Sequence, residues 1–127
     1  MNKGLWVVQA LLGVAFFMAG MMKATTAPAE LVANGMAWAE GMDPMLIKFI
    51  GVSEIAGALG LILPSALRIA PKLTPIAAVA LAVVMVLAAG THGMRGEFGA
   101  IVANAALGGL ALFVAWGRWS KSPIAPK

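Results

Sequence analysis

Four polar residues lie in otherwise apolar parts of this 127-residue chain and could do chemistry: Lys23, Glu54, His92 and Asn104. Glu54 is the most informative of them, because it lies inside an apolar segment from Met45 to Pro64. Inserting a lone carboxylate into a bilayer costs roughly 2.5–3.5 kcal/mol, so Glu54 needs a partner or a purpose. We predict that the four residues bind a small polar molecule or exchange protons with it.

Other kinds of site fit this residue set less well. One histidine, one carboxylate and one amide make a weak set of metal ligands, so no metal site is predicted. Ser53 directly precedes Glu54 and therefore points away from it on a helix, which argues against a Ser-His-acid triad. The chain has no cysteine, which excludes disulfides and thiolate redox chemistry. No catalytic residue is assigned, and the sequence does not decide whether the chain is an enzyme.

Each of the four residues also has a purely structural explanation. Lys23 could anchor a helix end at the membrane interface, and His92 could cap the carbonyl groups of a helix end. Asn104 could join two helices by a hydrogen bond, and Glu54 could form an ion pair with Lys23 or His92. The space beside Glu54 distinguishes the binding explanation from the structural one, because a binding site needs a cavity there and a structural pair does not.

The elements that position these residues are four apolar segments, at about residues 5–22, 45–63, 73–91 and 98–116. Each is close to the ~20 residues that a helix needs to span a bilayer. Hydrophobic residues make up 61% of the chain and charged residues only 11%, against about 25% charged residues in soluble domains. We therefore predict an all-α integral membrane four-helix bundle, with residues 1–127 forming a single transmembrane domain in contact with the lipid bilayer.

Helix breakers mark the joins between the segments: Pro28, Pro44, Pro64 with Pro71, and the run 91–97 with Gly93 and Gly96. In the longer connection, residues 24–44, Pro28 is expected to start a short helix whose partly apolar face includes Trp38. This helix is predicted to lie at the membrane interface. The alternative is a lid over a pocket at that end of the bundle.

Helical spacing places the polar residues on one face of each segment. In the second segment the residues Ile47, Ile50, Glu54, Ala58 and Leu61 recur at steps of three and four. Similar stripes run from Gln9 to Lys23, from Ala78 to His92 and from Ala100 through Asn104 to Ala115. Successive helices alternate in direction, so Lys23, Glu54, His92 and Asn104 are expected to converge in one half of the bundle. Gln9 is expected in the other half.

Basic residues predict the orientation of the chain in the membrane. The side that holds both termini carries six basic residues and no acidic one: Lys3, Arg68, Lys72, Arg118, Lys121 and Lys127. The other side carries three basic and four acidic residues: Lys23, Lys48, Arg95, Glu30, Glu40, Asp43 and Glu97. This distribution explains the net charge of +4 without nucleic-acid binding. We predict a multi-pass protein of a bacterial-type inner membrane with both termini in the cytoplasm.

A series of short motifs, in their order and spacing, resembles the DoxX-like family of small four-helix membrane proteins. The motifs are Met18–Lys23, Gly51–Glu54, Gly57–Pro64, Pro71–Pro75, Gly90–His92, Arg95–Glu97, Asn104 and Gly117–Arg118. The resemblance covers about residues 5–118. It implies a four-helix bundle with polar Lys, Glu, His and Asn positions, here Lys23, Glu54, His92 and Asn104.

The resemblance implies more than one kind of function. Some members are linked to quinone-coupled oxidation of thiosulfate, others to membrane oxidoreductase complexes, and an animal relative to the assembly of a receptor channel. We therefore expect an accessory subunit of a membrane redox system, with a polar pocket for a quinone or a similar molecule. The alternative is a non-catalytic assembly or interaction protein with a structural polar cluster. Its partner would be another membrane protein or a second copy of the chain.

Overall fold

The structure, a computed structural model, describes residues 1–127 and contains only helices as regular elements. In chain order they are α1 (Asn2–Thr25), α2 (Pro28–Ala33), η1 (Ala37–Ala39), α3 (Pro44–Leu67), α4 (Leu73–Met94), α5 (Phe98–Trp116) and η2 (Gly117–Lys121). Four helices, α1, α3, α4 and α5 continued by η2, are long and apolar enough to span a membrane. This confirms the predicted all-α membrane four-helix bundle with a short helix between the first two spans, and each predicted segment lies within one of these helices.

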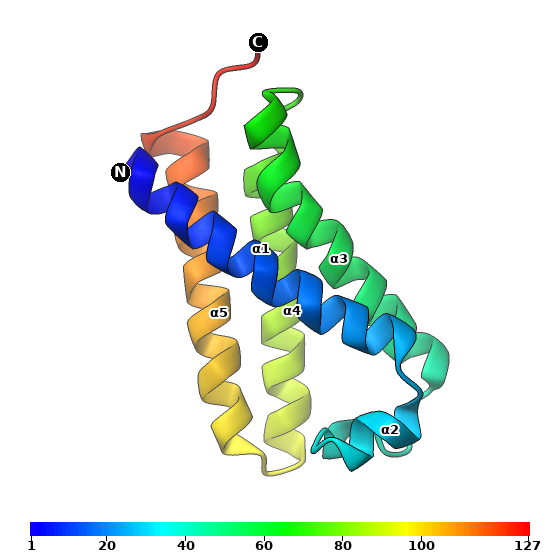
Figure 1. The fold of residues 1–127 in the computed structure, drawn as a ribbon. Helices are drawn as coiled ribbons and strands as arrows, with labels where there is room; N and C mark the ends of the chain where they lie inside the picture. The colour runs from blue at the N-terminus through cyan, green and yellow to red at the C-terminus, as the bar shows by residue number, and fades with distance from the viewer.

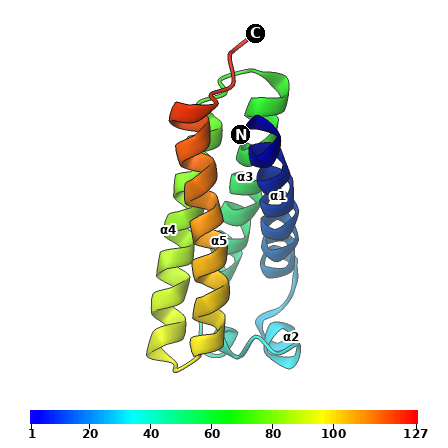
Figure 2. The ribbon, with the colours of Figure 1, turned by 90° about the vertical axis from the view of Figure 1, so that its left-hand side faces the viewer.

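The long helices pack as two pairs. Helix α1 packs mainly on α3 and crosses it obliquely, α4 packs along α5, and the contact between α3 and α4 joins the pairs (Figure 1). The side view in Figure 2 shows the two pairs on opposite sides of the molecule. Both termini and the α3–α4 turn lie at one end of the bundle, called here the terminal end. The α1–α3 connection and the α4–α5 turn lie at the other, called the loop end.

Helix α3 begins as predicted but ends later than predicted. The Asp43 side chain accepts a hydrogen bond from the Met45 backbone N–H at 2.9 Å, and Pro44 occupies the first turn, where its missing N–H is not needed. Pro64, predicted to mark a join, instead lies inside the helix. It cannot donate to the Gly60 carbonyl, and that oxygen accepts from Thr74 Oγ1 at 3.0 Å. A hydroxyl of α4 thus replaces the lost bond, and the helix continues to Leu67.

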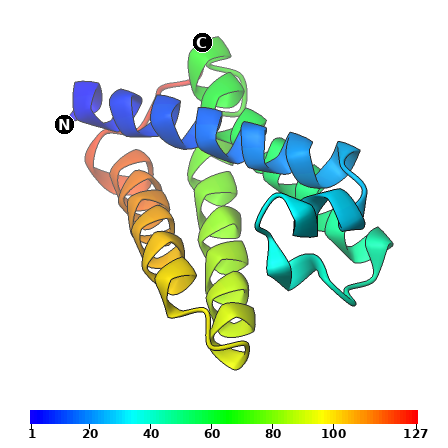
Figure 3. The same ribbon diagram turned by 60° about the horizontal axis from the view of Figure 1, so that its bottom comes forward.

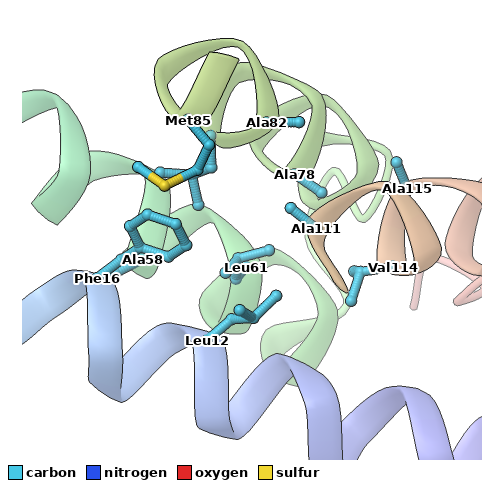
Figure 4. Packing of buried hydrophobic residues seen from close by; sticks show 11 residues of the cluster. Leu12, Phe16, Ala58, Leu61, Ala78, Ala82, Met85, Ala111, Val114 and Ala115 are labelled. Atoms are coloured by element: carbon cyan, nitrogen blue, oxygen red, sulfur yellow. The ribbon is translucent and has the colours of Figure 1, made fainter. Parts of the chain in front are cut away.

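The core lies where the four helices meet, around Leu12 and Phe16 of α1, Leu61 of α3, Met85 of α4 and Val114 of α5 (Figure 4). Only 26 of the 127 residues are buried, whereas large apolar side chains cover the outer faces of all four helices. Phe49, Val86 and Val102, for example, are each about 70% exposed. An outer surface of this kind is stable in contact with lipid tails and not with water.

Candidate functional site

A cavity of about 270 Å³ opens at the loop end, between the two helix pairs. Its polar lining consists of Lys23, Glu54, Thr91, His92 and Asn104, and its apolar lining of Met36, Trp38, Met42, Ile50, Val84, Met85 and Ala88. All four residues singled out from the sequence therefore border one space. Their role in binding or proton exchange stays a prediction. We call this space the loop-end cavity.

An ion pair between α1 and α3 borders the loop-end cavity. Lys23 Nζ lies 2.6 Å from Glu54 Oε1, and the Glu54 side chain is only 2% exposed. The Lys23 side chain is 19% exposed, and its ammonium group lies 5.8 Å from the centre of the Trp38 ring. Such a pair is neutral as a unit, which lowers the free-energy cost of keeping the carboxylate inside the membrane. An ammonium has three donors, and only one of those of Lys23 is used by Glu54.

Two glycines bring Lys23 and Glu54 together. Gly20 and Gly51 face each other where α1 crosses α3, one turn before each charged residue. A methyl group on Gly51 would lie 2.6 Å from the Gly20 carbonyl oxygen and 2.7 Å from the Ala24 nitrogen. Both are backbone atoms, so only a glycine fits while the helices stay this close. The short ion pair therefore depends on direct backbone contact.

His92 lies on the opposite wall and has a different partner from the one considered in the sequence analysis. Its Nδ1 lies 3.0 Å from Glu97 Oε1, so Lys23 and not His92 pairs with Glu54. Arg95 Nε donates to the same carboxylate oxygen at 3.2 Å, and Arg95 Nη2 donates to the Ala37 carbonyl at 2.9 Å. The hydrogen bond with His92, followed by the positive charge of Arg95, lowers the pKa of Glu97 below its ordinary value. The α4–α5 turn is thereby tied to η1.

Asn104 of α5 is poorly satisfied. Its Nδ2 donates only to Met85 Sδ, at 3.5 Å, and a thioether is a weak acceptor. Its Oδ1 is buried and has no hydrogen-bond partner. Rotating the amide by 180° exchanges the two atoms and again leaves one of them unpaired. A buried polar atom without a partner costs about 1–3 kcal/mol, so Asn104 is poorly explained as a contact between helices.

The α1–α3 connection forms one wall of the loop-end cavity. Leu31, Ala39 and Ile47 are buried against one another and hold this connection to the start of α3. Met36, Trp38 and Met42 of the same segment then border the cavity. Figure 3, with the loop end turned forward, shows the connection on the side of the bundle away from α5. The segment predicted to contain a short helix is therefore also part of the candidate site.

A second polar cluster, at the terminal end, was only partly anticipated. Gln9 is fully buried and donates to the Leu61 carbonyl at 2.6 Å. Its Oε1 accepts from Arg118 Nε at 2.7 Å, and Arg118 Nη1 donates to Asn2 Oδ1 at 2.7 Å. The sequence pattern places Arg118 among the basic residues of this end and in the motif Gly117–Arg118, but does not predict its burial; the residue is 3% exposed. Gln9 could have indicated the burial of Arg118, because a buried amide at that end needs a hydrogen-bond partner from another helix.

The comparisons with known proteins give one result. The sequence profile of the DoxX-like family matches residues 7–114, a range that contains all four residues of the loop-end cavity singled out above. No curated protein and no solved structure matches the chain significantly.

Proposed function

We propose, on the premise that this chain belongs to the DoxX-like family, that it is a membrane protein whose loop-end cavity binds the ring of a quinone or quinol. The protein would act as an accessory subunit of a membrane redox system. The observation that carries this proposal is the combination, beside one cavity, of a neutral Lys23–Glu54 pair and an Asn104 amide with an unpaired buried atom.

The polar groups suit the two oxygens of such a ring. The ammonium of Lys23 retains donors that Glu54 does not use, and these can bind a carbonyl or hydroxyl oxygen. The unpaired atom of Asn104 lies on another helix and can bind a second oxygen. Quinone oxygens accept hydrogen bonds and quinol hydroxyls also donate them, so the ligand fits either orientation of the amide.

The apolar part of the cavity suits a flat ring. Three of its side chains, Met36, Met42 and Met85, are flexible thioethers, and Trp38 supplies an aromatic surface. The volume of about 270 Å³ is slightly below the roughly 300–1,000 Å³ of pockets for drug-sized ligands. This size fits one substituted ring, and an isoprenoid tail would extend into the bilayer.

Proton exchange is the chemistry that the chain itself can supply. Oxidation of a quinol releases two protons and two electrons. Glu54 and His92 are the groups of the cavity that can accept a proton, with Lys23 and Asn104 holding the ring. The chain has no cysteine and carries no side chain that holds electrons stably. The electrons would therefore pass to or from a bound cofactor or a partner protein, which supports a role as one subunit of a redox system.

Fluorescence offers a direct test. Trp38 is the one tryptophan that borders the cavity, and Trp6, Trp116 and Trp119 lie at the terminal end. A short-chain ubiquinone analogue and its quinol should quench the fluorescence of the purified protein in a saturable way. This quenching should disappear in Trp38→Phe.

Asn104→Leu should weaken this binding about tenfold, because one hydrogen bond to the ligand is lost. Ser53→Ala is the matched control, since the Ser53 hydroxyl donates to the Phe49 carbonyl on its own helix. Absence of saturable quenching by both forms, or equal affinity in Asn104→Leu and the original protein, would overturn the proposal.

A second candidate, an interaction protein, is favoured by the exposed face of α5. Only Ala111, Val114 and Ala115 of this 19-residue helix are buried. Its exposed face carries small residues at helical spacing, namely Gly99, Ala103, Ala106 and Gly109. Small residues of this kind allow another helix to approach closely.

The native chain has no cysteine, so a single introduced cysteine reports contacts between copies cleanly. If a second copy docks on α5, Ala106→Cys should cross-link in membranes, whereas Ala15→Cys on the exposed face of α1 should not. Equal cross-linking at both positions, or none, would remove self-association through α5.

The distribution of charge supports a proposal for orientation. The terminal end carries six basic and no acidic side chains, so it would face the cytoplasm of a bacterial-type inner membrane. The loop-end cavity would then open near the outer surface. A membrane-impermeant thiol reagent should label Ala33→Cys and not Ser122→Cys in intact cells, and the reverse result would contradict this orientation.

A further inference from the structure

A second cavity lies at the terminal end, on the far side of the bundle from the loop-end cavity. It has a volume of about 400 Å³. The α3–α4 turn, through Pro71 and Lys72, forms one wall, Arg118 and Trp119 form another, and the C-terminal tail closes it with Pro123 and Ile124. Figures 1 and 2 show the tail and the α3–α4 turn together at this end.

The charge of Arg118 at this cavity has no acidic counter-ion, although the guanidinium lies 5.3 Å from the centre of the Trp6 ring. Its guanidinium donates to Gln9 Oε1, Asn2 Oδ1 and, at 2.9 Å, the Ser122 carbonyl. All three acceptors are neutral. The remaining nitrogen, Nη2, is buried and has no acceptor. Because the side chain is 3% exposed, this is a buried cation without a counter-ion, an arrangement that is costly unless an anion completes it.

Lys72 adds a second cation to the same cavity. Its ammonium group lies 5.5 Å from the centre of the Trp119 ring. No acidic side chain is available nearby, because all five belong to the loop end or to the Lys23 pair: Glu30, Glu40, Asp43, Glu54 and Glu97. Both basic residues therefore line the cavity without an acidic side chain as partner.

We propose that this cavity binds a phosphate group, with Arg118 and Lys72 as its ligands. The one guanidinium nitrogen of Arg118 without an acceptor, Nη2, can donate to a phosphate oxygen, and the Lys72 ammonium can bind a second oxygen as a point charge. Trp116 and Trp119 at the same end are about half exposed, as in the aromatic belts that lie at the level of lipid head groups. The phosphate oxyanion of an anionic phospholipid therefore lies within reach of the site, and a soluble phosphate compound has the same chemistry.

The tail provides the entrance to this site. Two hydrogen bonds join residues 123–127 to Arg68. Arg68 Nε donates to the Ala125 carbonyl at 2.8 Å, and the Lys127 N–H donates to the Arg68 carbonyl at 3.0 Å. Both belong to exposed residues, so the tail can shift outward without disturbing the core. An oxygen that enters the cavity then takes the place of the tail beside Arg118.

Thermal unfolding of the purified protein in vesicles tests this site. In one arm, phosphatidylglycerol is titrated into phosphatidylcholine vesicles. In the other, inorganic phosphate is titrated at constant ionic strength in phosphatidylcholine alone. A saturable rise of the unfolding temperature with the lipid only identifies a lipid head group as the ligand, and a rise with phosphate as well identifies a soluble phosphate compound. No rise in either arm would overturn the proposal.

Two lysine variants distinguish specific phosphate binding in this cavity from non-specific attraction of an anion to a basic protein. Lys72→Gln should weaken the apparent affinity about fivefold, because one cation near the membrane surface is lost. Lys48→Gln, which removes the same charge from an exposed position at the loop end, should leave it unchanged. Equal effects of the two variants would overturn the proposal. The test does not require a substitution of the buried Arg118.

Discussion

The two ends of the bundle bury polar side chains in different ways. At the terminal end, the Gln9 amide uses both its donor and its acceptor, and Ser65 and Thr74 bond each other at 2.7 Å. At the loop end, the Asn104 amide has only a thioether partner and lies beside a cavity. A fully bonded amide fixes the positions of helices, whereas an unpaired amide beside open space is available to a ligand.

The ends also differ in charge. The loop end pairs Lys23 with Glu54 and therefore offers a neutral site with hydrogen-bonding groups. The terminal end surrounds the Arg118 guanidinium with neutral acceptors and the Trp6 ring, and gives it no acidic counter-ion. One fold can thus carry two sites that prefer different ligands. The loop end suits a neutral ring with polar substituents, and the terminal end suits an anion.

The largest expected effect comes from filling the contact between α1 and α3 near the loop end. Gly51→Ala should destabilise the protein by about 3 kcal/mol, because its methyl group meets backbone atoms that cannot rotate away. At the terminal end, the three atoms nearest to a methyl group on Gly117 belong to the Leu5 side chain and not to backbone. A side chain can adjust more easily than backbone, so Gly117→Ala should lose less stability than Gly51→Ala. Unfolding in mixed micelles by denaturant titration measures both.

Gly109→Ala is the control for this pair of substitutions, since no atom lies within 4 Å of the added carbon. It should leave stability unchanged or raise it slightly, by helix propensity. A greater loss for Gly117→Ala than for Gly51→Ala would contradict the view that backbone contact holds the loop-end ion pair.

Removing one member of the ion pair should have the next largest effect. Glu54→Leu leaves the Lys23 ammonium without its partner and should destabilise the protein by about 2 kcal/mol, less than for a fully buried pair because Lys23 is 19% exposed. The double variant Lys23→Met/Glu54→Leu should regain most of this stability but bind no quinone analogue. Restored binding in the double variant would show that the pair is only structural.

A matched pair of amide substitutions tests the comparison of the two ends most directly. Gln9→Leu should cost about 1–3 kcal/mol, because the Leu61 carbonyl and Arg118 Nε both lose a partner. Asn104→Leu should leave stability unchanged or raise it, since an unpaired buried atom is removed. Equal losses in a denaturant titration would mean that both amides are structural.

The smallest expected effect is a pH dependence of the α4–α5 turn. The pKa of Glu97 is lowered in the folded protein, mainly by its hydrogen bond with His92. The contribution of Glu97 is therefore complete at neutral pH and is lost as the pH falls through its lowered pKa. After correction for the pH dependence of intrinsic amide exchange, the protection of the turn against hydrogen exchange should fall on acidification in the original protein and less so in Glu97→Gln. Glu40→Gln, at an exposed residue of the same end, should keep the full loss of protection.

The sequence alone determined the helices, the membrane environment and the faces that turn inward. Runs of about 20 apolar residues leave few alternatives in a bilayer, where every backbone group must bond within its own segment. Helical spacing likewise placed Lys23, Glu54, His92 and Asn104 on inward faces, and the structure has them beside one cavity. The short motifs also predicted the DoxX-like family, and the family match over residues 7–114 confirms this prediction.

Only the tertiary structure decided which polar groups pair and which stay unpaired. Spacing gives the direction of a side chain, but pairing depends on distances set by helix crossings, such as the contact of Gly20 with Gly51. The choice of Lys23 over His92 as the partner of Glu54, and the burial of Arg118 against Gln9, both follow from those crossings. The continuation of α3 past Pro64 likewise needed a hydroxyl from another helix, Thr74, which local sequence rules do not include.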